Sequence, residues 1–223
     1  MGNYHRKIRK ARPLTPERSD GGRVVIFGNG KLSKKFLQEI HKGDYVIGVD
    51  RAAYWLLMHD IRPNIAIGDF DSATRREFDL IKKSIKTVKI YPKMKDKTDM
   101  ELTIEHANNL HPEETIIFGA TGTRLDHMLA TLHLLDKHIL IDNKNRIRLI
   151  GRGKTIIEKA SYRYISILPY TKSIMLSLTG FRYDLVRKTL KQGTTLGVSN
   201  EIYRAQGTIR IFSGKAWVIE SND

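Results

Sequence analysis

Apolar and polar positions alternate in two different ways along the first two-thirds of the chain. Short apolar runs, most of them ending at Gly, Asp or Pro as buried strands do, occupy residues 24–27, 45–49, 65–67, 88–90, 116–118 and 139–141. Between them, apolar residues recur at helical spacing. One such stripe comprises Leu125, Met128, Leu129, Leu132 and Leu135, and we expect it to be a buried helix face. Alternating strands and helices predict a parallel α/β sheet up to about residue 142.

After Asn143 the helical spacing stops, and short strand patterns follow one another. We expect strands at 146–150, 154–157, 164–168, 174–179, 208–212 and 216–219, with Ser213-Gly214 as a tight hairpin turn. The prediction is therefore a three-layer α/β domain at residues 23–143 and an all-β sandwich at residues 144–223. Residues 1–22 are polar and basic and show no apolar period, so they are expected to be a disordered extension.

Charge and composition narrow the function only partly. The chain has 39 Lys and Arg against 24 Asp and Glu, a net charge of +15. Such charge suits either an enzyme of anionic substrates or an RNA-binding protein. The basic residues are not interleaved with aromatics, so nucleic acid is not the expected partner. The absence of cysteine excludes disulfides, thiolate zinc sites and cysteine nucleophiles. Without an apolar run of membrane-spanning length or a signal peptide, no membrane contact and a cytoplasmic location are expected.

Two groups of aspartates are the strongest candidates for chemistry. Asp69 and Asp71 follow an apolar run in Gly-Asp-Phe-Asp-Ser, and Asp96 and Asp99 form a second group. Carboxylates on a loop that leaves a buried strand can bind Mg²⁺, which takes oxygen ligands. Ordinary loop chemistry is the alternative. Aspartates make polar turns, Ser72 could cap the next helix, and Thr98 to Glu101 matches a capping box.

A third candidate is the glycine-containing segment 119–127, a strand-to-helix loop. Backbone amides at a helix start favour anions, and Arg124 could bind a phosphate bidentately. If Leu125 is buried, Asp126 and His127 point elsewhere. They could instead be an ordinary first-turn acid and a structural hydrogen-bonding histidine. Ligands of parallel sheets bind beyond the carboxyl ends of the strands, where Asp50, the Asp69 loop and this segment would meet. Gly28 to Lys31 is a weak signal, because it matches neither a dinucleotide fingerprint nor a P-loop.

Four blocks in order, GDFDS (68–72), DKTDME (96–101), TGTRLDH (121–127) and GVSNE (197–201), resemble the thiamine pyrophosphokinase family. The resemblance runs from residue 23 to the C-terminus. It implies transfer of the pyrophosphoryl group of ATP to the hydroxyl of thiamine with Mg²⁺, giving thiamine diphosphate and AMP. It also implies a homodimer with active sites at the subunit interface. ATP and Mg²⁺ would bind the α/β domain, and thiamine would bind the β-sandwich.

The resemblance also assigns roles to residues. Asp69, Asp71 and Asp99 would bind the metal. The catalytic group would be Asp71, Asp99, Arg124 and Asp126. ATP would contact Asp50, Asp96, Thr121 and Arg124, and thiamine would contact Ser199 and Asn200. Two alternatives stay open, a D-x-D nucleotide-sugar transferase and a basic RNA-binding protein. The first explains neither DKTDME nor GVSNE. Metalloprotease, serine hydrolase and protein kinase signatures are absent.

Overall fold

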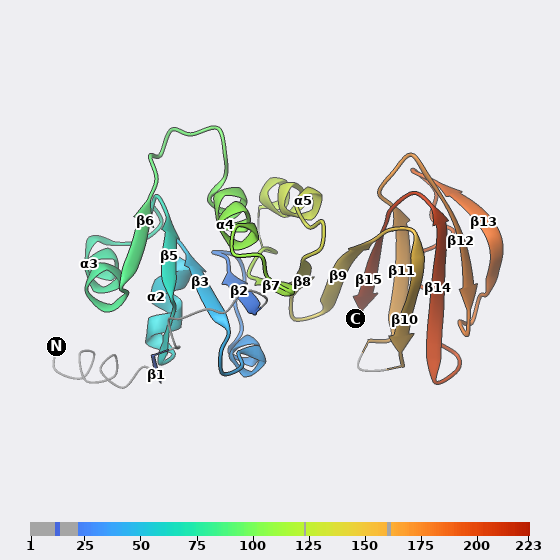
Figure 1. Cartoon of the computed structure of the whole chain (residues 1–223), viewed down its shortest axis with the longest axis horizontal. Helices are drawn as coiled ribbons and strands as arrows, with labels where there is room; N and C mark the ends of the chain where they lie inside the picture. Colours follow the sequence, from blue (N-terminus) through green and yellow to red (C-terminus); the bar gives the residue numbers. More distant parts are fainter. Residues whose placement is uncertain (1–11, 14–21, 123, 160–161) are drawn as a thin grey trace. The chain divides into compact units, whose positions relative to one another are not determined.

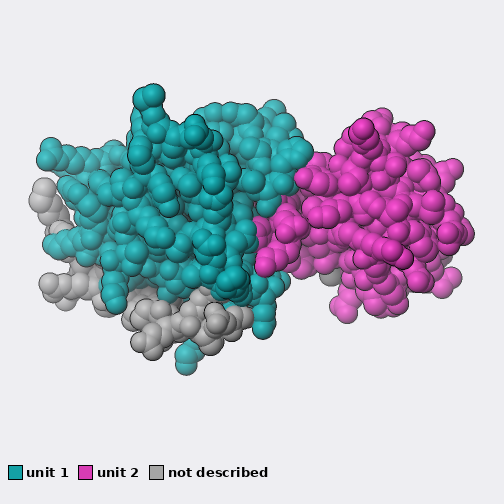
Figure 2. Space-filling model, turned by 45° about the horizontal axis from the view of Figure 1, so that its top comes forward, with its two compact units in different colours: residues 1–134 teal, residues 135–223 magenta. Residues whose placement is uncertain are grey.

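The computed structural model describes residues 12–13, 22–122, 124–159 and 162–223. The chain forms two compact units, residues 1–134 and 135–223 (Figure 2). The division falls earlier than the predicted boundary after Asn143, because β8 (Ile139–Ile141) pairs antiparallel with β9 (Asn145–Ile150) in the second unit. The predicted disordered extension, residues 1–22, lies mostly outside the described residues. Within it, β1 (Arg12–Pro13) pairs with β4 (Ile61–Arg62).

The first unit contains the predicted parallel sheet, in the strand order β7-β2-β3-β5-β6 (Figure 1). All its pairs are parallel. The strands are β2 (Arg23–Phe27), β3 (Tyr45–Val49), β5 (Ile65–Gly68), β6 (Thr87–Ile90) and β7 (Glu114–Phe118). The chain runs from β2 through β3 and β5 to β6, and then continues with β7 on the other side of β2. The strand order therefore reverses between β2 and β7, the position where open α/β sheets bind ligands.

Helices cover both faces of this sheet, as a three-layer α/β fold requires. They are the 3₁₀ helix η1 (Lys34–Glu39), α2 (Arg51–Met58), α3 (Arg75–Ser84), α4 (Asp99–Asn108) and α5 (Leu125–His133). On one face, Ala53 of α2 and Ile81 of α3 pack with Ala66 of β5. On β3, Gly48 lies against Ala53, whereas Tyr45, on the opposite face of the strand, approaches His106 of α4. Thus α4 covers the face opposite α2 and α3.

Two expectations for this unit were wrong, and one alternative is not realised. The predicted buried stripe on α5 is partly exposed, with Leu125 64% and Leu129 53% accessible. The run at 88–90 is not a buried strand, because β6 is the sheet edge and leaves Ile90 58% exposed. Ser72 does not cap α3. The N-cap is Thr74, which forms a reciprocal capping box with Glu77.

The second unit is the predicted β-sandwich. Strands β8, β9, β15 and β11 pair in that order, and β10, β14, β12 and β13 pair as a second sheet. The remaining strands are β10 (Gly153–Glu158), β11 (Tyr164–Pro169), β12 (Ser173–Thr179), β13 (Leu185–Lys191), β14 (Gln206–Ser213) and β15 (Ala216–Ser221). Ile167 and Val218 of one sheet share a core with Leu176 and Ile209 of the other.

Two details of the sandwich differ from expectation. The predicted hairpin at Ser213-Gly214 is wrong, because this turn joins β14 to β15 in different sheets. Strand β13 was not predicted, since its exposed residues give no alternating apolar pattern. Among the described residues, no helix has the length and apolar character needed to span a bilayer.

Candidate active site

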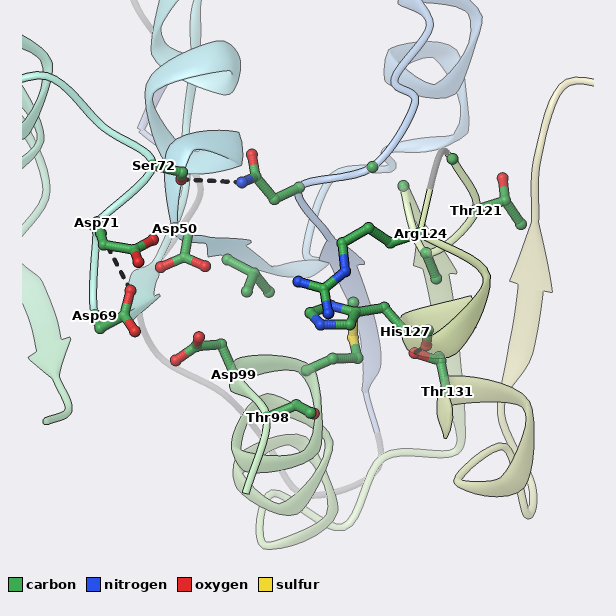
Figure 3. A pocket seen from close by; sticks show the side chains of 17 residues that line it. Asp50, Asp69, Asp71, Ser72, Thr98, Asp99, Thr121, Arg124, His127 and Thr131 are labelled. Carbon is green, nitrogen blue, oxygen red and sulfur yellow. Dashed lines mark hydrogen bonds between the residues drawn. The ribbon is translucent and has the colours of Figure 1, made fainter. Parts of the chain in front are cut away.

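A cavity of about 460 Å³ lies at the carboxyl edge of the parallel sheet in the first unit (Figure 3). It is bounded by the loops after β2, β3, β5 and β7 and by the starts of α4 and α5. Six residues predicted from the sequence line it: Asp50, Asp69, Asp71, Asp99, Thr121 and Arg124. These residues come from four separate segments of the chain, and the sheet topology brings them together.

The loops after β2 and β7 lie side by side at one wall of the cavity. Gly28 N–H donates to Phe118 O at 2.7 Å, and Gly30 N–H donates to Gly119 O at 2.7 Å. A Cβ atom at Gly30 would lie 2.5 Å from Gly119 O, so the contact requires glycine there. Asn29 and Gly30 line the cavity, although their segment matches no phosphate-binding motif and was judged a weak candidate from the sequence. The segment follows the strand at which the strand order reverses, and that position could have identified it as part of the site.

Three aspartates form a cluster that fits a divalent cation. Asp50, Asp69 and Asp99 each offer a carboxylate oxygen, and these oxygens lie within 4.8 Å of one another. Asp99 begins α4 directly after its N-cap Thr98, whose hydroxyl accepts a hydrogen bond from Glu101 N–H at 3.1 Å. Asp99 Oδ1 is buried, and it lies 3.1 Å from the ammonium of Lys95. Closely spaced carboxylates of this kind suit Mg²⁺. The cluster includes Asp50, which the sequence assigned to the nucleotide.

Asp50 has an unusual backbone and an unusual charge state. It is 9% exposed, and its φ of 48° is uncommon for a residue other than glycine. Its Oδ1 accepts a hydrogen bond from Phe70 N–H at 3.0 Å. Burial raises the pKa of Asp50 to about 7, with smaller contributions from the negative charges of Asp99, Asp69 and Asp71. A bound cation would favour its ionised form.

Two lysines from the β6–α4 loop neutralise part of this negative charge. Lys95 Nζ lies 3.1 Å from Asp69 Oδ2 and 3.1 Å from Asp99 Oδ1. Burial opposes ionisation of Asp69, but the Asp71 N–H and Lys95 outweigh it and lower the pKa of Asp69. Lys93 Nζ lies 3.1 Å from Asp71 Oδ2, and Asp71 is 48% exposed. Asp71 thus stands at the open rim beside the cluster.

Across the cavity, Arg124 and His127 also face the interior (Figure 3). Arg124 Nε donates to Asp126 Oδ1 at 3.1 Å, and this hydrogen bond lowers the pKa of Asp126 to about 2. Both side chains are exposed, so the pair can open when a stronger anion arrives. His127 lines the cavity although the sequence favoured a structural role for it. Asp96 is exposed and is not among the described residues that line the cavity.

The predicted thiamine residues lie in the second unit, on the segment between β13 and β14. Asn200 is buried, and its Oδ1 accepts from Tyr183 N–H at 3.1 Å and Glu201 N–H at 2.9 Å. Its Nδ2 donates to Tyr183 O at 2.8 Å. Ser199 N–H donates to Ser166 Oγ at 3.0 Å. Asn200 therefore holds its own loop together, a role that the sequence did not predict.

Comparison with known proteins agrees with this site. The family profiles "Thiamin pyrophosphokinase, catalytic domain" and "Thiamin pyrophosphokinase, vitamin B1 binding domain" match residues 36–149 and 154–215. Thiamine pyrophosphokinase of Bacillus subtilis (strain 168) is 39% identical over 186 residues, covering 79% of this chain and 87% of that protein.

Solved structures give the same result. The crystal structure of thiamine pyrophosphokinase from B. subtilis superposes with a TM-score of 0.84 at 35% identity, covering 90% of this chain and 99% of that one. The crystal structure of thiamin pyrophosphokinase from Geobacillus thermodenitrificans gives a TM-score of 0.83 at 30% identity, covering 90% of this chain and 98% of that one. Family membership indicates an enzyme that pyrophosphorylates thiamine. The chain belongs to the thiamine pyrophosphokinase family.

Proposed function

We propose that this chain transfers the pyrophosphoryl group of ATP to the hydroxyl of thiamine in its first-unit cavity, and that Mg²⁺ assists. The observation that carries the proposal is the cluster of Asp50, Asp69 and Asp99 at the carboxyl edge of the sheet, facing Arg124 across one cavity. This combination offers oxygen ligands for a divalent cation and a guanidinium for the phosphates. Neither a sugar transferase nor an RNA-binding protein is supported by the family relationship.

The residues of the cluster would hold Mg²⁺, which supplies compensation for the negative charge of the polyphosphate when bound. Arg124 binds phosphate oxygens through two parallel N–H groups after releasing Asp126. Thr121, which lines the cavity, and Lys93, whose Nζ lies 3.1 Å from Asp71 Oδ2, orient the polyphosphate so that the hydroxyl attacks in line and AMP leaves. Asp71, exposed at the rim, is the carboxylate best placed to accept the hydroxyl proton.

The thiamine subsite and the dimer belong to the same proposal. Ser199 and Asn200 lie among exposed apolar and aromatic side chains of the second unit, namely Tyr183, Leu196, Val198 and Tyr203. On the first unit, Leu125 and Leu129 of α5 are also exposed. Apolar surface of this kind is typical of interfaces and of aromatic ligand sites. It supports a homodimer whose subunits complete each other's active sites. The cytoplasmic location stays a prediction.

The direct test is product analysis with purified protein, ATP and Mg²⁺, with and without thiamine. We expect AMP and thiamine diphosphate to appear in equal amounts, and only when thiamine is present. Release of ADP or inorganic phosphate in place of AMP would contradict pyrophosphoryl transfer. Thiamine-independent AMP release would contradict thiamine as the acceptor.

A further inference from the structure

Lys95 lies between two aspartates of the carboxylate cluster. Its Nζ contacts Asp69 Oδ2, Asp99 Oδ1 and the carbonyl oxygen of Pro92, each at 3.1 Å. The lysine side chain is 14% exposed, and the carboxylates of Asp69 and Asp99 are 13% and 19% exposed. This is a nearly buried ammonium between two of the three aspartates that could bind a cation. A lysine elsewhere on the same loop behaves differently, since Lys97 is half-exposed and pairs with Glu105.

A buried ammonium and a divalent cation compete for the same carboxylates. Both need the lone pairs of Asp69 and Asp99, and two cations held there together would repel each other. Without a cation, however, the three carboxylates would repel one another in a poorly solvated place. In the free protein, the positive charge of Lys95 reduces this repulsion. It can also leave, because it sits on the β6–α4 loop, residues 91–98, and not within a strand or helix (Figure 1).

We propose that Lys95 is the counter-ion of the free enzyme, and that it releases Asp69 and Asp99 when Mg²⁺ arrives with the nucleotide. This rests on the proposed function. The released ammonium then binds phosphate oxygens, for which it is a suitable point-charge partner. A metal ion that binds alone displaces Lys95 and leaves its ammonium without an anionic partner. When polyphosphate binds with the metal, its oxygens become the new partner of Lys95. The free enzyme therefore binds divalent metal weakly, and metal and nucleotide strengthen each other's binding.

Lys95→Met separates the two roles, because it keeps most of the aliphatic side chain and removes the charge. We expect the Kd of Mn²⁺ for the nucleotide-free protein, measured by electron paramagnetic resonance, to fall about 10-fold, while the Kd of a Mg²⁺-bound non-hydrolysable ATP analogue rises about 10-fold. Lys97→Met removes the same charge from the same loop and should change neither constant by more than about 2-fold. Unchanged or weaker Mn²⁺ binding by Lys95→Met would overturn the counter-ion role. Unchanged analogue binding would overturn the phosphate role.

The wild-type protein provides a second measurement that does not depend on the variant folding. Lysine acylation followed by mass spectrometry should show Lys95 labelled slowly in the free protein, faster with saturating Mn²⁺, and slowly again once the ATP analogue is added. Labelling that Mn²⁺ does not change would contradict the proposal. Neither measurement involves turnover or thiamine, so either can fail while thiamine-dependent AMP release still succeeds.

Discussion

The carboxylate of Asp50 accepts a hydrogen bond from the backbone N–H of Phe70 at 3.0 Å. This bond ties the loop after β3 to the loop after β5, on the neighbouring strand. It also fixes Phe70, whose φ of 58° lies in the left-handed region. Asp69 and Asp71 flank Phe70, so the direction of both carboxylates depends on Asp50. The predicted metal site is therefore organised by a residue outside the Asp-Phe-Asp motif.

Asp50→Asn should change the pH dependence of stability. The pKa of Asp50 is about 7 in the folded protein against 3.8 as the ordinary value, so the folded state retains a proton that the unfolded chain has lost. Its stabilising contribution is complete below pH 3.8 and is lost as the pH rises through about 7. Asparagine keeps the acceptor for Phe70 and removes the titration. In urea denaturation with EDTA, the unfolding free energy of the variant relative to wild type should rise by roughly 1–3 kcal/mol as the pH increases from 5 to 8. Parallel pH profiles would contradict this assignment.

Gly68→Ala should displace the carboxylate of Asp50 or the loop after β5. An added Cβ would lie 2.0 Å from Asp50 Oδ1, so the carboxylate or the loop must move. We expect turnover to fall roughly 10-fold or more, since small displacements of positioned groups are costly. Gly153→Ala is the matched control, because Gly153 also has a positive φ of 142° but has open space around its Cα. If both variants lost activity equally, backbone strain and not the collision with Asp50 would be the cause.

Much of the fold followed from apolar periodicity, whereas side-chain environments did not. The parallel strands and the sandwich were predictable because short apolar runs signal buried strands regardless of their neighbours. The exposure of Leu125 and Leu129 was not, because helical spacing identifies an apolar face but not what covers it. Similarly, Asp50 was predicted to contact the nucleotide. Its place beside Asp69 and Asp99 depends on β3 lying next to β5, which no local pattern encodes.

Asp71→Asn and Asp96→Asn should differ sharply, although the motifs treat both aspartates as site residues. Asp71 lines the cavity, and its variant should lose turnover by roughly 100-fold or more through loss of the proposed proton acceptor. Asp96 is exposed away from the described lining, and its variant should keep turnover within about 3-fold of wild type. Steady-state AMP formation at saturating thiamine and ATP measures both. A severe Asp96 defect would place that residue in the site after all.

Leu129→Glu should weaken the proposed dimer. Leu129 is 53% exposed on α5, and Leu125 of the same helix is 64% exposed. A charge in an apolar interface would be desolvated without a partner, so we expect the dimer Kd to rise roughly 10-fold or more. Analytical ultracentrifugation over a concentration series measures this. Ile156→Glu, at another exposed apolar position, is the control and should leave association unchanged. A wild-type monomer at all concentrations would refute the dimer directly.

Ser199→Ala and Asn200→Ala should separate ligand binding from loop integrity in the second unit. The amide of Asn200 joins Tyr183 to Glu201, so its removal takes away the partner of three partly buried backbone groups. We expect a loss of about 2–3 kcal/mol in unfolding free energy, together with a higher thiamine KM. Ser199 anchors its loop through its backbone N–H, not its hydroxyl. Its variant should therefore raise the thiamine KM and leave the urea midpoint unchanged. If only the KM for ATP changed in either variant, the thiamine subsite would lie elsewhere.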